Sequence, residues 1–128
     1  MTYREFADGL RAWAKADRGL EAAVGLLIAH RVWVDRATSE PWSAPFPGAR
    51  LFYRPTDDCD LAVVDWAEAR HLAARTSHDV SAQDCQVLSI VIALAGQRRS
   101  TDPFELVGLS ETNLTLVSDA IAHYIGVR

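Results

Sequence analysis

The sequence predicts an all-α fold: a compact bundle of about five helices in one domain spanning residues 1–128, with at most a short β-hairpin and a proline-rich loop besides. Three observations favour this class. Apolar residues recur at helical spacing in most segments, capping residues precede those segments, and only two short runs suit strands. A chain of 128 residues, 49% hydrophobic and 23% charged, has the composition of a soluble globular domain with its own core.

The N-terminal part predicts two helices. The first is amphipathic and runs from about Tyr3 to Ala16, because Tyr3, Phe6, Ala7, Leu10, Trp13 and Ala14 form one apolar stripe. Asp17 can cap the second, which is apolar nearly all round, is therefore expected at the centre of the fold, and should end near Arg36. Gly25 in its interior costs about 1 kcal/mol relative to Ala, and close approach of another helix backbone would explain it.

The stretch from Ala37 to Arg50 contains three prolines and Gly48, which exclude regular structure over most of it. Connections of this length are usually functional or disordered. Trp42 and Phe46 argue against disorder, because disordered linkers are poor in aromatic residues. Beyond this loop, Leu51–Tyr53 and Leu61–Val64 suit the two strands of a small hairpin.

Three further helices are predicted in the C-terminal half. Asp65, Ser81 and Ser110 stand at their capping positions. The first of the three should end near Arg75, and the second, the most apolar segment of the chain, should end at Gly96. A single short turn follows from Asp102 to Gly108. The last helix should end at Gly126, and its expected inner stripe is Leu114, Val117, Ile121 and Tyr124.

Charge and hydropathy exclude several classes of function. The net charge of −4 argues against a dedicated nucleic-acid-binding protein, which would carry a basic face. No apolar run approaches the roughly 20 residues that a membrane helix needs. The first turns carry Arg4, Glu5 and Asp8, unlike a signal peptide, and two cysteines without a signal peptide suggest reduced thiols in the cytoplasm.

Candidates for chemistry are few. Asp57, Asp58 and Asp60 could converge on Mg²⁺ or Ca²⁺, since hard cations prefer oxygen ligands, but an Asp-rich turn also forms without a metal. His71, His78 and Cys85 could ligate zinc, although a helix break between them favours an exposed His71 and a buried Cys85 instead. No phosphate-binding loop or serine-nucleophile motif is present, so no cofactor is expected.

Three groups of residues carry a resemblance to a known class of proteins. They are Leu20-Glu21-Ala22-Ala23 leading to Trp33, Val64-Asp65-Trp66, and Asn113-Leu114 with Val117. With them the chain resembles uncharacterised small proteins of high-GC Gram-positive bacteria. That group has no assigned function, so the resemblance implies no catalytic or binding residues.

The sequence therefore favours a non-enzymatic helical module that binds another protein or itself in the cytoplasm, without nucleic acid or membrane. Trp42 and Phe46 are the expected interaction residues, because prolines reduce the entropy that a loop loses on docking and aromatic side chains are enriched at interfaces. The opposite interpretation, in which both rings cover the protein's own core, stays open. The alternative function is a metal-dependent enzyme that uses Asp57, Asp58 and Asp60.

Overall fold

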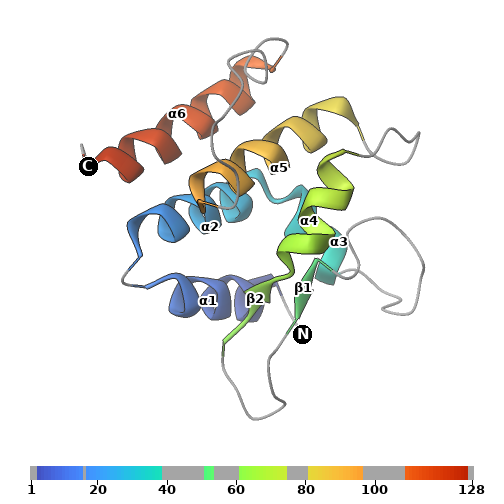
Figure 1. The fold of residues 1–128 in the computed structure, drawn as a ribbon, viewed down its shortest axis with the longest axis vertical. Helices are drawn as coiled ribbons and strands as arrows, with labels where there is room; N and C mark the ends of the chain where they lie inside the picture. Colours follow the sequence, from blue (N-terminus) through green and yellow to red (C-terminus); the bar gives the residue numbers. More distant parts are fainter. Residues whose placement is uncertain are drawn as a thin grey trace.

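The computed structural model describes residues 3–15, 17–38, 51–53, 61–74, 81–96 and 109–126. These residues form six helices and one pair of short strands (Figure 1). In chain order the elements are α1 (Tyr3–Ala14), α2 (Arg18–His30), α3 (Val32–Thr38), β1 (Phe52–Tyr53), β2 (Val63–Val64), α4 (Trp66–Ala73), α5 (Ala82–Leu94) and α6 (Glu111–Ile125). Helices make up 79% of the described residues, which confirms the all-α prediction.

Helix α2 is the central element. It packs against α1, α3, α5 and α6, as its nearly all-round apolar sequence predicts. α5 and α6 run in one direction and α2 in the opposite direction (Figure 1). At its N-terminal end α2 comes so close to the end of α5 that a Cβ atom on Gly19 would fall 2.7 Å from the backbone oxygen of Leu94. The close helix contact that the sequence placed at Gly25 is therefore at Gly19.

The caps predicted from the sequence are confirmed. Asp17, Asp65, Ser81 and Ser110 each accept a hydrogen bond from the backbone N–H three residues later, at 2.9, 3.1, 3.1 and 3.2 Å. Such caps satisfy N–H groups that the first turn of a helix leaves without an intrahelical partner. At the other ends, Gly96 and Gly126 both adopt positive φ, of 78° and 82°, as expected of glycines that follow a helix.

The single helix predicted from Asp17 to Arg36 is divided in two. Arg31 adopts a φ of 70°, a conformation that costs a non-glycine residue on the order of 1–3 kcal/mol, and separates α2 from α3. The break lets Trp33 become fully buried and donate its indole N–H to the backbone oxygen of Asp84 on α5, at 3.2 Å. Burying a tryptophan contributes about 4–6 kcal/mol, so tertiary packing outweighs the local cost.

The hairpin expected beyond the loop is present in short form. Phe52 pairs with Val64 and Tyr53 with Val63 in an antiparallel register. Phe52 is buried, and its ring centroid lies 6.1 Å from that of Phe6 on α1. Two strands of this length are marginal alone, and contact with α1 supports them.

The predicted inner stripe of the last helix is only partly correct. On α6, Val117 and Ala120 are buried, whereas Leu114, Ile121 and Tyr124 are 39%, 39% and 47% exposed. Because α6 packs mainly across α2, its contact is centred on Val117 and Ala120, and one side of its apolar surface is left uncovered.

The interior is one hydrophobic cluster to which every described helix contributes. Trp33 is completely buried, and Trp13 and Trp66 pack against the cluster with their ring centroids 6.3 Å apart. Trp33 is therefore a core residue, and Trp13 and Trp66 extend the core at its edge. Within the described ranges, no helix combines the length and the hydropathy needed to cross a membrane.

The two glycines of α2 predict opposite effects of the same substitution. Gly19→Ala should lower the free energy of unfolding by about 1–3 kcal/mol, because the new Cβ forces α2 and α5 apart. Gly25→Ala should raise it by up to about 1 kcal/mol, because no atom lies within 4 Å of the new Cβ and alanine favours the helix. Thermal unfolding followed by circular dichroism measures both effects. A destabilised Gly25→Ala variant would contradict an open face of α2 at position 25.

Candidate functional site

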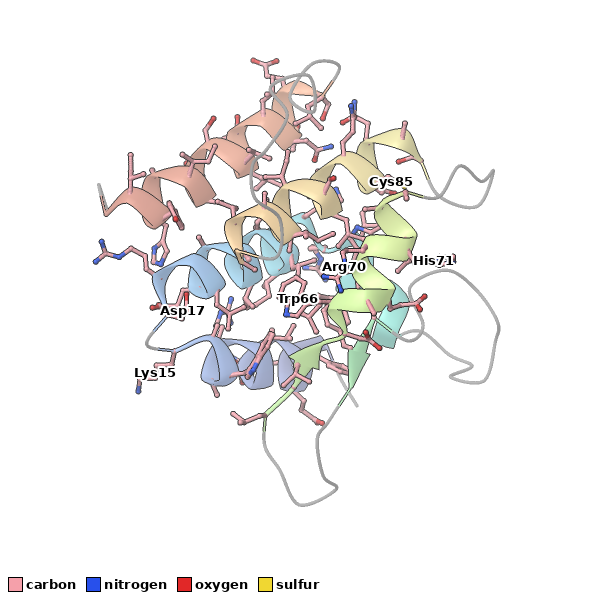
Figure 2. The ribbon with its side chains drawn as sticks, viewed as in Figure 1. Lys15, Asp17, Trp66, Arg70, His71 and Cys85 are labelled. Atoms are coloured by element: carbon pink, nitrogen blue, oxygen red, sulfur yellow. The ribbon has the colours of Figure 1, made fainter. Side chains whose placement is uncertain are left out.

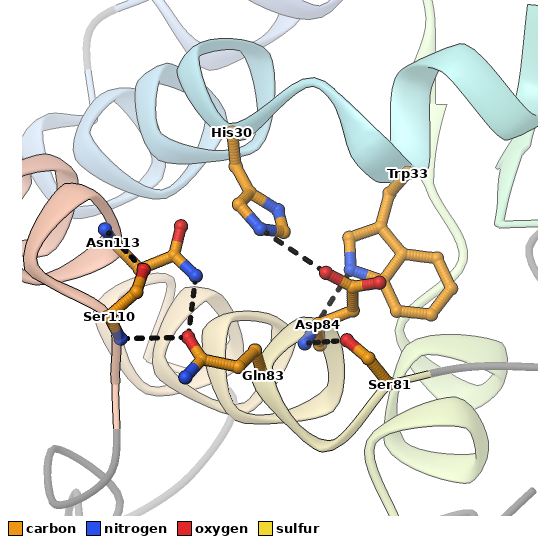
Figure 3. Close-up of polar contacts among 7 residues, drawn as sticks. All are labelled: His30, Trp33, Ser81, Gln83, Asp84, Ser110 and Asn113. Carbon is orange, nitrogen blue, oxygen red and sulfur yellow. Dashed lines mark hydrogen bonds and ion pairs between the residues drawn. The ribbon is translucent and has the colours of Figure 1, made fainter.

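A polar cluster lies where the first turns of α5 and α6 approach the end of α2 (Figure 3). Gln83 on α5 accepts hydrogen bonds from the Ser110 backbone N–H at 2.9 Å and from the Asn113 side-chain amide at 2.7 Å. His30 Nε2 lies 3.5 Å from Asp84 Oδ1, with only 5% of the histidine side chain exposed. These contacts fix the starts of α5 and α6 relative to one another and to α2.

Within the described ranges, the pair of His30 and Asp84 is not joined to a nucleophile. A general base needs a nucleophile within hydrogen-bond reach, and among the described residues His30 Nδ1 has no hydrogen-bond partner. The neighbouring hydroxyl of Ser81 is the cap of α5 and accepts the Asp84 backbone N–H. We therefore interpret the cluster as structural.

Burial lowers the pKa of His30 below its ordinary value, and the nearby carboxylate of Asp84 opposes this shift without cancelling it. The folded state therefore prefers the neutral imidazole. The stability that this preference provides is complete above the unfolded-state pKa of about 6.5 and is lost as the pH falls through the lowered pKa.

We expect the free energy of unfolding to fall between about pH 6.5 and the lowered pKa of His30, by at most about 1.4 kcal/mol per pH unit from this group. His30→Gln should remove this part of the pH dependence. His71→Gln, at an exposed position on α4, should retain it. Urea unfolding across this pH range measures the effect, and an unchanged slope in His30→Gln would contradict the assignment.

The candidate metal sites are not assembled in the described part of the chain. There, no group of three or more His, Cys, Asp or Glu side chains could hold a metal ion. His71 is exposed on α4, while Cys85 is buried on α5 (Figure 2). The Cys85 thiol donates to the Leu72 backbone oxygen at 3.5 Å. Asp57, Asp58, Asp60 and His78 lie outside the described residues, as do Trp42 and Phe46.

The candidate binding site is a groove that the sequence did not predict. It runs along one face of α2, between α1 and α6, and has a volume of about 460 Å³. Its lining comes from α1 (Arg11, Ala14), α2 (Glu21, Ala22, Val24, Gly25, Leu26, Ala29) and α6 (Leu116, Asp119, Ala120, His123). This volume lies within the roughly 300–1,000 Å³ of typical ligand sites.

Small residues form the floor of the groove and charged residues form its edges. Gly25 and Ala29 are exposed on α2, so the helix backbone itself is accessible from solvent. At one end His123 Nε2 on the α6 wall lies 3.8 Å from Glu21 Oε2 on α2. On the α1 side Arg11 is held 3.8 Å from Asp8. The groove thus offers an apolar floor with both signs of charge at its edges.

One signal in the sequence could have indicated this surface. Gly25 interrupts an otherwise strong helix at a cost of about 1 kcal/mol, and it lies at helical spacing between Ala22 and Ala29. Which side of α2 stays open depends on where α1 and α6 pack, and periodicity within α2 alone does not determine that.

No family model, curated protein or solved structure matches this chain. The functional interpretation therefore depends on the geometry of the groove and on the chemistry of its residues.

Proposed function

We propose that the protein is a helical interaction module that binds an apolar, helical segment of another protein in the groove between α1, α2 and α6. The supporting observation is Gly25. It lies in the middle of the central helix, is exposed, and has no atom within 4 Å of its Cβ position. Glycine at this position lowers the stability of the helix, and no packing constraint accounts for it. We therefore infer that it keeps the groove free of a side chain at this position.

A helix suits this groove better than an anion or a nucleotide. Two neighbouring helices form its walls, and a floor without side chains at Gly25 lets a partner backbone approach closely. Amphipathic helices bind hydrophobic grooves through residues at i, i+3, i+4 and i+7. The opposite charges of Arg11 and Asp119 at the two walls would orient such a helix.

The cytoplasm remains the proposed location. The thiol of Cys85 supports it, because this thiol is buried and hydrogen-bonded to a backbone oxygen, as is typical of a cysteine used as a small apolar residue. Trp42 and Phe46 remain a second predicted interaction surface.

A displayed library of helical peptides, selected on the wild-type protein, tests the proposal. Gly25→Leu should weaken binding of the selected peptides by at least about tenfold, because its side chain projects into the groove from a position where no atom lies within 4 Å of the Cβ. Ala67→Leu, an equally apolar change at an exposed position on α4, should leave binding unchanged.

Peptides that bind Gly25→Leu as tightly as the wild type would contradict the groove as the binding site. If those same peptides lose affinity for a variant with Trp42→Ala and Phe46→Ala, the aromatic loop is the interaction surface instead.

A further inference from the structure

Helix α6 carries a second apolar surface on its outer side. The large hydrophobic residues that are exposed within the described ranges all belong to this helix: Leu114 (39%), Ile121 (39%), Tyr124 (47%) and Ile125 (61%). Leu114, Ser118, Ile121 and Ile125 follow one another at intervals of four, three and four residues, which is the spacing of a coiled-coil seam. We call Leu114, Ser118, Ile121 and Ile125 the α6 seam.

The α6 seam is separate from the groove. The groove is lined on α6 by Leu116, Asp119, Ala120 and His123, and none of these belongs to the seam. At 100° per residue the two sets lie on different sides of the helix. α6 also lies at the outer edge of the described helices (Figure 1), and the residues of its seam are exposed. A partner on the seam would therefore leave the groove open.

We propose that the α6 seam binds the α6 seam of a second copy of this chain, with the two helices antiparallel. In this arrangement a two-fold axis pairs Leu114 of one copy with Ile125 of the other. It likewise pairs Ser118 of one copy with Ile121 of the other. The small Ser118 side chains near the axis let the helices approach closely. Such a symmetric interface uses the same patch on both copies.

The charges at the two ends of α6 favour the antiparallel orientation. Glu111 is exposed in the first turn of α6. At the other end the Arg18 guanidinium lies against the C-terminal cap, since a Cβ atom on Gly126 would fall 2.6 Å from Arg18 Nη1. Antiparallel pairing brings each Glu111 to the end of the partner helix where Arg18 lies, and it also aligns the helix dipoles favourably. Parallel pairing would place the two Glu111 side chains together.

The size of the seam predicts the strength of the dimer. From Leu114 to Ile125 the helix rises about 16 Å, at 1.5 Å per residue. This length is short for a standard interface, so the dimer should be weak, with a dissociation constant in the micromolar range or above. The dimer should appear only in concentrated solution.

Sedimentation equilibrium at concentrations up to about 1 mM tests the proposal. Ile121→Glu should abolish the dimer, because it places a charge in the seam, while its exposed position preserves the fold. Thr112→Glu adds the same charge at an exposed position of α6 outside the seam and should leave the dimer intact. Circular dichroism verifies that both variants are folded.

A charge exchange tests the orientation. Glu111→Arg and Arg18→Glu should each weaken the dimer by about tenfold, because both end contacts become repulsive. An equimolar mixture of the two variants should recover dimer formation, since every end contact between unlike copies is again attractive. If either substitution acted only within its own chain, mixing the two variants would not restore the dimer.

A wild-type protein that stays monomeric up to about 1 mM, or a dimer that tolerates Ile121→Glu, would overturn the seam as the interface. A mixture that fails to recover the dimer would overturn the antiparallel arrangement. Gly25→Leu should leave self-association unchanged. The sedimentation experiment therefore tests the dimer independently of peptide binding in the groove.

Discussion

The pairing of α2 with α5 is the constraint on which the rest of the structure depends. At one end Gly19 allows the helix backbone to approach the Leu94 carbonyl closely. At the other end Asp84 contacts both helices that meet at Arg31: its carbonyl oxygen accepts the indole N–H of Trp33 at the start of α3, and its carboxylate faces His30 at the end of α2. With both ends fixed, the distance and rotation of the two helices are determined, and the break at Arg31 follows from the burial of Trp33.

The groove is a consequence of this arrangement. Once α5 occupies one side of α2, α1 and α6 pack on its two flanks and leave the face with Gly25 and Ala29 open. Alanine at position 25 would stabilise the chain, because it favours the helix and its Cβ would have no atom within 4 Å. An open face kept at the expense of stability is the pattern expected of a binding surface.

Local features of the sequence predicted much of the fold. Asp17, Asp65, Ser81 and Ser110 mark helix starts correctly because capping depends on residues only three positions apart. The break at Arg31 could not be predicted in this way, because the burial of Trp33 against α5 causes it. Likewise, the stripe on α6 was assigned correctly as apolar, but which part of it is buried depends on how α6 crosses α2. The groove was missed for the same reason, since three helices form it.

Thiol labelling of Gly25→Cys tests the central claim most directly, because this claim is that the face of α2 at position 25 is open in the folded protein. The native Cys85, which is buried, serves as an internal control in the same molecule. After a short exposure to a thiol reagent, peptide mass mapping should find position 25 labelled at nearly the rate of an unstructured thiol and Cys85 unlabelled. Protection of position 25 equal to that of Cys85 would show that the face is covered and would contradict the account.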